Sequence, residues 1–137
     1  MYCSAQVNSQ SCTPAIAGSG SASATQLAAF DIRASNLINQ TSGILFYGST
    51  PFASPHLGGT LCVREPVRRT AVQNTGGNLA GPDCSGAPSF DFNAFIRSAA
   101  DPALGAGDEV FAQYWSRDAT AVSTTNLTDA LAFFVNP

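Results

Sequence analysis

The chain has 137 residues, a length that indicates one domain with a single substantial core. Its net charge is −3 and only 11% of its residues are charged, which argues against nucleic acid as the main partner. Lysine is absent, so Schiff-base catalysis, a phosphate-loop lysine and a lysine–asparagine isopeptide crosslink are excluded.

Residues 2–26 open the chain with two of its four cysteines, Cys3 and Cys12, followed by a run of small residues. We expect an N-terminal segment pinned by disulfide bonding, with its first loop ended by Pro14. The run from 15 to 26 fits a flexible linker and an irregular edge strand equally well.

Alternation of apolar and polar residues predicts strands through the rest of the chain. The clearest is 43–49, GILFYGS, which Pro51 and Pro55 are expected to end. The predicted strands are, in chain order, 27–34, 43–49, 60–64, 67–73, 89–96, 108–118 and 127–135.

The segment 108–118, DEVFAQYWSRD, is predicted to be the central strand of the sheet. With a period of two, its faces carry Val110, Ala112 and Tyr114 on one side and Phe111, Gln113, Trp115 and Arg117 on the other. Because both faces carry large apolar groups, we expect both to be at least partly covered.

Seven to eight short antiparallel strands, separated by Gly, Pro and Asn signals, predict an all-β sandwich of jelly-roll or immunoglobulin-like type. We expect a single extracellular domain over residues 1–137. A small β-barrel is the alternative. No stretch predicts a long capped helix, and only 125–131 fits a single helical turn.

The four cysteines, Cys3, Cys12, Cys62 and Cys84, have no metal-ligand spacing, and a single histidine, His56, cannot complete a zinc site with them. Two disulfides are therefore expected. Of the three possible connectivities, the neighbouring pairs Cys3–Cys12 and Cys62–Cys84 are the simplest.

Disulfides indicate an oxidising compartment, so we expect a secreted or extracellular protein. The chain begins without a signal-peptide pattern, and the export signal is expected upstream of this chain. No apolar run approaches the roughly 20 residues of a membrane helix, so no membrane span is expected. Sequons at Asn39 and Asn126 mark candidate surface positions.

Catalytic chemistry is poorly represented. His56 lies in a Pro/Gly-rich loop and no G-x-S-x-G elbow is present, which favours an exposed or structural histidine over a Ser-His-acid triad. The acidic residues qualify for paired-carboxylate chemistry by residue type alone: Asp91, Asp108, Glu109, Asp118 and Asp129. We expect no enzymatic activity, no cofactor and no metal.

A small basic island, Arg64 with Arg68 and Arg69, is a candidate site for a carboxylate or sulfate. The more common role of such residues is to lie along a polar strand face.

Four aromatic residues with polar tips are candidates for stacking on a sugar: Trp115, Tyr114, Tyr47 and Tyr2. A lone tryptophan on a central strand is more often part of the sandwich core, and we expect Trp115 to be buried there.

Several short motifs occur in a fixed order: YC, NSQSCTP, ILFYG, GGTLCV with PVRRT, QNTGGN, DCSG, FDFNAF, and QYWSRD with NLTDAL. This series, which covers nearly the whole chain, resembles a cysteine-bearing domain recurrent at the C-terminal end of large secreted proteins of free-living bacteria. The resemblance implies a β-rich extracellular accessory domain. It implies no activity and brings no catalytic residues.

Our first functional hypothesis is a non-catalytic extracellular or cell-surface module, structural or adhesive, of a secreted bacterial protein. An alternative is a self-assembling subunit of an extracellular fibre, in which segment 127–135 or 15–26 pairs with a neighbour. Another is a carbohydrate-binding module. The expected partners are other copies of the chain or extracellular glycans.

Overall fold

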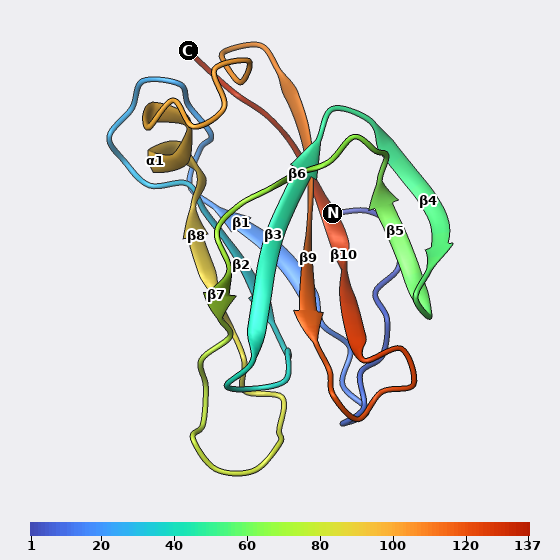
Figure 1. The fold of residues 1–137 in the computed structure, drawn as a ribbon. Coiled ribbons are helices and arrows are strands. Elements are labelled where there is room, and N and C mark those ends of the chain that lie inside the picture. The colour runs from blue at the N-terminus through green and yellow to red at the C-terminus, as the bar shows by residue number, and fades with distance from the viewer.

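The computed structural model describes residues 1–137 and shows an all-β fold of ten strands with one short helix (Figure 1). The elements are β1 (Ala15–Ser19), β2 (Asp31–Ser35), β3 (Ser42–Gly48), β4 (Pro51–His56), β5 (Gly59–Val63), β6 (Arg68–Arg69), β7 (Gln73–Asn74), β8 (Ser89–Asp91), α1 (Phe92–Arg97), β9 (Glu109–Arg117) and β10 (Thr125–Phe134).

The strands form three antiparallel sheets. The central sheet has the order β10-β9-β3-β6, with β7 also pairing with β3. A second sheet has the order β1-β2-β8, and β4 with β5 forms a separate hairpin. The sheets do not join into a closed barrel. The alternative of a small barrel is therefore wrong, and the predicted sandwich is confirmed.

One face of the central sheet is closed by β1, β2, β8 and α1. Fourteen buried residues form the core on this side, among them Leu45 of β3, Tyr114 of β9 and Ile32 of β2. Phe92 of α1 belongs to this core, and its ring centroid lies 5.3 Å from that of Tyr47. We call this the closed face.

The opposite face is covered only by the β4–β5 hairpin and the N-terminal residues. Its core has four buried residues, Phe46, Val63, Phe111 and Leu127. The predicted alternation of β9 is confirmed, because Phe111 and Trp115 lie on this face whereas Tyr114 lies on the closed face. We call this the open face.

One strand was missed and one alternative about element type is wrong. The strand predicted at 43–49 does end at Gly48, ahead of Pro51, but Pro51 and Pro55 then lie in a further strand, β4, which pairs only with β5. An edge strand tolerates proline since its outward N–H groups need no partner. The segment 125–131, which fitted a helical turn, is part of β10.

The predicted strand 89–96 is a strand only as far as Asp91 and then becomes α1. The Asp91 carboxylate caps this helix by accepting a hydrogen bond from the Ala94 N–H at 3.2 Å. Phe92 and Ile96 are four residues apart, so they satisfy helical spacing as well as the alternation that suggested a strand.

Three other boundaries differ from prediction. The run 15–26 contains a regular strand, β1, which pairs with β2 along its whole length. The strand predicted at 27–34 begins only at Asp31, because residues 27–29 are exposed and unpaired. The segment 67–73 is broken into the short strands β6 and β7.

All four cysteines are in disulfides, but the predicted neighbouring pairs are wrong. The bonds are Cys3–Cys62 and Cys12–Cys84, which span 59 and 72 residues. Both therefore tie the N-terminal segment to distant parts of the fold instead of closing short local loops. Two disulfides are compatible with an oxidising, extracellular environment.

The two sequon asparagines do not lie on the surface as predicted. Asn39 is buried, and its Nδ2 donates hydrogen bonds to the carbonyl oxygens of Asn78 and Gly81 at 2.6 and 2.8 Å. Asn126 is also buried, and its Nδ2 donates to the Gln6 carbonyl at 2.8 Å. Both amides hold loops in place.

Candidate functional site

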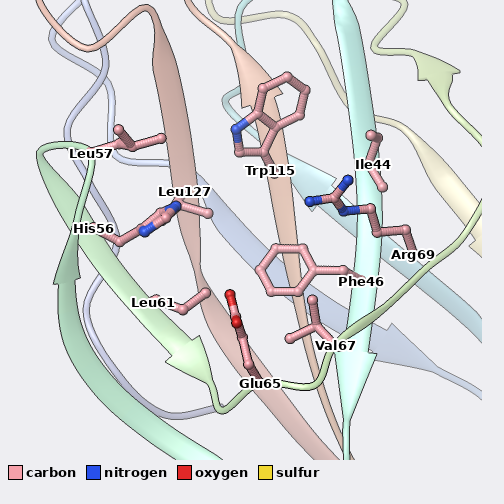
Figure 2. A pocket seen from close by; sticks show the side chains of 10 residues that line it. All are labelled: Ile44, Phe46, His56, Leu57, Leu61, Glu65, Val67, Arg69, Trp115 and Leu127. Atoms are coloured by element: carbon pink, nitrogen blue, oxygen red, sulfur yellow. The ribbon is translucent and has the colours of Figure 1, made fainter.

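A cleft of about 300 Å³ opens on the open face, between the β4–β5 hairpin and the segment that joins β5 to β6 (Figure 2). Its floor comes from β3, β9 and β10, which contribute Ile44, Phe46, Trp115 and Leu127. One wall is formed by His56, Leu57 and Leu61, and the other by Glu65, Val67 and Arg69. Seven of the ten lining residues are hydrophobic.

The cleft exists because a two-stranded hairpin is too narrow to cover the sheet beneath it. Phe46 and Leu127 are buried, whereas Ile44 and Trp115 on the same face are only half-buried. Apolar surface therefore continues past the edge of the hairpin, in the size range of small ligand pockets.

The hairpin wall is fixed to the sheet by the fully buried amide of Gln113. Its Nε2 donates hydrogen bonds to the carbonyl oxygens of Thr60 at 2.9 Å and Thr128 at 2.7 Å. Its Oε1 accepts one from the Cys62 N–H at 3.0 Å. One side chain thus joins β5, β9 and β10. Both ends of its amide have hydrogen-bond partners, so the amide can be buried in an apolar layer.

The N-terminal residues hold the same wall from the other side. Cys3 is bonded to Cys62 of β5, and the Tyr2 hydroxyl donates a hydrogen bond of 2.6 Å to the Cys62 carbonyl. The Tyr2 ring packs edge-on against Phe111, with 5.8 Å between ring centroids. Burial raises the pKa of the Tyr2 hydroxyl from 10.0 to about 12.

Three ionisable side chains, Arg69, Glu65 and His56, stand exposed at the mouth of the cleft. Figure 2 shows the Arg69 guanidinium between Trp115 and Phe46, and the Glu65 carboxylate directed toward the space between Phe46 and the hairpin. Neither takes part in an ion pair, since the one ion pair of the chain joins Arg68 to Asp101. The cleft therefore combines an apolar floor with unpaired charges of both signs.

The predicted basic island does not form a single site. Arg68 and Arg69 are neighbours in β6 and pair with Tyr47 and Phe46 respectively, so their side chains lie on opposite faces of the central sheet. Arg64 is separate again and lies over the Phe52 ring, 5.3 Å from its centroid. Only Arg69 reaches the cleft.

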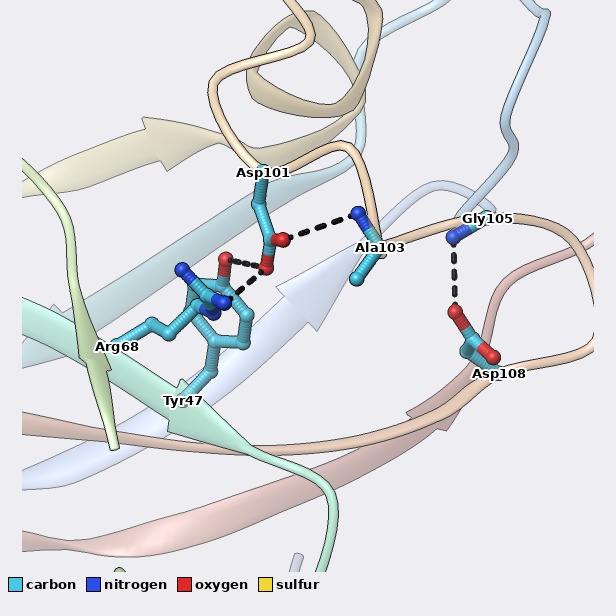
Figure 3. Close-up of polar contacts among 6 residues, drawn as sticks. All are labelled: Tyr47, Arg68, Asp101, Ala103, Gly105 and Asp108. Atoms are coloured by element: carbon cyan, nitrogen blue, oxygen red, sulfur yellow. Dashed lines mark hydrogen bonds and ion pairs between the residues drawn. The ribbon is translucent and has the colours of Figure 1, made fainter. Parts of the chain in front are cut away.

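Arg68 belongs to a polar network with Tyr47 and Asp101, beside the loop that follows α1 (Figure 3). The Asp101 carboxylate accepts a hydrogen bond of 2.7 Å from the Tyr47 hydroxyl and lies 3.2 Å from the Arg68 Nε. It also accepts one from the Ala103 N–H, which fixes the loop after α1. Burial, together with the Asp101 carboxylate, raises the pKa of Tyr47 far above its usual value.

Of the predicted sugar-stacking aromatics, Tyr47 and Tyr114 are buried in the closed face. The Tyr114 hydroxyl donates a hydrogen bond to the Gln73 Oε1 at 3.1 Å, and burial raises its pKa well above the usual range. Trp115 is not the fully buried core residue that we predicted. It packs beside the small open-face core and lines the cleft, and the Arg117 guanidinium carbon lies 5.4 Å from its ring centroid.

His56 is exposed, in agreement with one of the two roles predicted for it, and its ring makes no hydrogen bond. Three of the carboxylates considered for catalysis instead accept hydrogen bonds from backbone N–H groups. Asp108 accepts from the Gly105 N–H at 2.8 Å, Asp118 from the Ser9 N–H at 2.8 Å, and Asp129 from the Ile16 N–H at 2.8 Å. No three His, Cys, Asp or Glu side chains gather where they could hold a metal ion.

Most of the cleft residues were not singled out by sequence reasoning. The signal that was available is the pair Leu57-Gly58, which forms a two-residue turn between two strands. Because β4 was not predicted, neither the hairpin nor the cleft wall that the hairpin forms was expected from the sequence.

Comparisons of the chain with known protein families, with characterised proteins and with solved structures find no match. The structure contains no helix with the length and apolar character needed to cross a membrane.

Proposed function

We propose that this protein is a non-catalytic extracellular adhesion module that binds its partner through the open-face cleft. The observation that carries this proposal is the cleft itself, where half-buried Trp115 and Ile44 lie beside the unpaired charges of Arg69 and Glu65. An apolar hollow with a few convergent polar groups is the usual form of a binding site.

The extracellular setting is supported by the disulfides. Each joins the N-terminal segment to a part of the chain at least 59 residues away. Such bonds persist in oxidising environments and stabilise a small fold against unfolding. The rigid attachment of the hairpin wall also suits a module that must keep its binding surface preformed.

The non-catalytic part of the proposal is supported by the residues that line the cleft. They include one carboxylate, Glu65, whereas glycoside hydrolysis uses two. His56 is the one imidazole of the cleft, and no serine, threonine or cysteine lines the cleft beside it.

The other two functional hypotheses lead to different expectations. A sugar-binding module would use an open aromatic plane, but Arg117 lies over the Trp115 ring. A fibre subunit would add a neighbour to β10 or β1, the outermost strands of their sheets. The outer edge of β10 is already occupied in part, because Tyr2 and Gln6 form backbone hydrogen bonds with Ala130 and Leu127. On β1 the Ile16 N–H donates to the Asp129 carboxylate, so a neighbour would have to displace these contacts.

The test uses Trp115 as the only tryptophan of the chain. The protein is titrated with panels of peptides, oligosaccharides and acyl compounds while Trp115 fluorescence and the ¹H–¹⁵N NMR spectrum are recorded. We expect saturable changes at cleft residues with one of these classes. If none of the panels affects the cleft, the proposal is wrong. Filaments in electron micrographs would favour the fibre subunit.

A further inference from the structure

The turn of the β4–β5 hairpin places a leucine where the backbone disfavours it. His56 pairs with Gly59, and the two residues between them, Leu57 and Gly58, have φ values of +49° and +83°. This is the geometry of a type I′ turn, in which Asn, Asp and Gly are preferred since other side chains are strained at positive φ. The Leu57 side chain is nevertheless 52% exposed, so burial does not compensate for the strain.

Leu57 separates two hollows on the surface. It lines the cleft described above, and it also lines a second cavity of about 450 Å³ on the other side of the hairpin turn. The second cavity is bordered by Val7 and Val122, which are both exposed. The cleft and the second cavity therefore meet at Leu57 and form one track, which is mostly apolar in the cleft and mixed in the second cavity, where four of nine lining residues are hydrophobic. A strained residue at such a position points to a role in binding.

The track also contains unsatisfied polar groups. Gln6 lines the second cavity, and its Oε1 is buried without a hydrogen-bond partner. At the other end, Arg69 is exposed at the mouth of the cleft and has no carboxylate partner in this chain. Arg117 lies on the same face over Trp115. Two cations against the single carboxylate of Glu65 favour an anionic partner.

We infer that the track binds an extended polypeptide segment of a partner protein that carries two apolar side chains and a carboxylate. One apolar side chain enters the cleft, the second enters the second cavity, and the backbone crosses Leu57. The carboxylate pairs with Arg69. This inference rests on the proposed function and specifies the partner class.

An extended polypeptide fits the arrangement better than the other two ligand classes. Alternate side chains of such a segment point to one side, so two of them can occupy separate hollows. A sugar would need many hydrogen-bonding side chains, whereas the cleft is mostly apolar. An acyl chain is a single apolar tail, so with its carboxylate at Arg69 it would fill the cleft and leave the second cavity empty.

The test uses acetylated decapeptides with two leucines spaced two or four residues apart and one aspartate beside them. Matched peptides carry lysine for aspartate, or serine for both leucines. Binding to the full chain is followed by Trp115 fluorescence and by NMR shifts in both hollows. We expect at least one aspartate peptide to bind, with about tenfold weaker binding of its lysine counterpart. Arg69→Glu should reverse that preference.

The decisive variant is Leu57→Asn, because asparagine tolerates positive φ and should keep or improve the turn. We expect unchanged or higher thermal stability and about tenfold weaker peptide binding. Leu79→Asn is the matched control, since Leu79 is 88% exposed but lies outside the track, and it should bind normally.

Several outcomes would overturn the inference. Normal peptide binding by Leu57→Asn would show that the track is not used. Cleft shifts with cellohexaose, chitohexaose or decanoate, but with none of the decapeptides, would leave the proposed function standing and refute the polypeptide partner. Concentration-dependent self-association that Leu57→Asn abolishes would identify a second copy of this chain as the occupant instead. If no probe of any class perturbs the cleft, both proposals fail.

Discussion

The two faces of the central sheet have the same alternating pattern but are covered very differently. The closed face is packed against three strands and a helix and encloses fourteen buried residues. The open face is packed against one hairpin and the N-terminal residues and encloses four. The closed face therefore supplies most of the apolar burial that stabilises the fold, while the open face keeps apolar surface in contact with solvent.

This difference shows how a small protein can be both stable and able to bind. Residues that line a cleft contribute less to the free energy of unfolding than core residues, because part of their apolar surface stays exposed to water. Here the closed face and two long-range disulfides stabilise the fold, so the open face can remain incompletely covered. The comparison predicts how substitutions on the two faces should differ.

The largest effect is expected from Phe92→Ala on the closed face. Phe92 is fully buried and contacts the rings of Tyr47, Phe95 and Phe133. Removing it should lower the free energy of unfolding by about 5 kcal/mol, the upper end for phenylalanine truncation. Urea denaturation measures this. A loss below about 1 kcal/mol would contradict the assignment of the main core to this face.

Removal of the Cys3–Cys62 bond should cost nearly as much. A loop of 59 residues corresponds to about 4 kcal/mol on the chain-entropy model. The double variant Cys3→Ala, Cys62→Ala should also speed hydrogen exchange in β4 and β5 relative to β1 and β2, because the hairpin loses its anchor.

The matched control is Cys12→Ala with Cys84→Ala, whose loop of 72 residues has a similar chain-entropy effect. It should leave the exchange of the hairpin relative to β1 and β2 unchanged. Equal acceleration in both double variants would show that the hairpin is not held by its own disulfide.

Trp115→Ala on the open face should cost about 2 kcal/mol, less than Phe92→Ala, because the ring is only half-buried. Iodide should quench its fluorescence partially, between the limits for buried and free tryptophan. Destabilisation equal to that of Phe92→Ala would show that the cleft closes over this ring in solution.

The smallest effect concerns alkaline pH. All three tyrosines, Tyr2, Tyr47 and Tyr114, have pKa values raised above 10.0 by burial. A raised folded pKa adds stability that is fully present below pH 10 and is lost as the pH rises through the folded value. Tyr2, on the open face, should ionise first, near pH 12.

A spectrophotometric titration checks this order. Native protein should form little tyrosinate near pH 10, whereas protein in concentrated urea should titrate there. Tyr2→Phe should remove the first native step. Tyrosinate appearing at pH 10 in folded protein would mean that these hydroxyls are not buried.

The long strands were predictable because their side chains alternate regularly. For β9, the pattern of Val110 and Tyr114 against Phe111 is enough to assign both faces from the sequence alone. The helix α1 was not predictable from alternation, since Phe92 and Ile96 satisfy two periods. Short apolar runs do not distinguish these cases.

The cleft was harder to predict because it depends on what covers the open face. Proline is uncommon inside strands, so Pro51 and Pro55 argued against a strand where β4 lies. The disulfide pairing also depends on tertiary contacts, and four cysteines allow three connectivities whatever their spacing. Cys62 lies beside Cys3 because β5 is docked on the central sheet, where Gln113 holds it, and spacing along the chain does not reveal this docking.

The buried amides of Asn39 and Asn126 limit the choice of host for producing this protein. A eukaryotic secretory pathway adds glycans to Asn-X-Thr sites as the chain emerges, before folding can hide them. A glycan on Asn39 would take the place of the hydrogen bonds to Asn78 and Gly81, and one on Asn126 would separate β10 from the N-terminal segment. Yeast or mammalian material should therefore be heterogeneous or misfolded, whereas export to a bacterial periplasm supplies the oxidising conditions without the glycans.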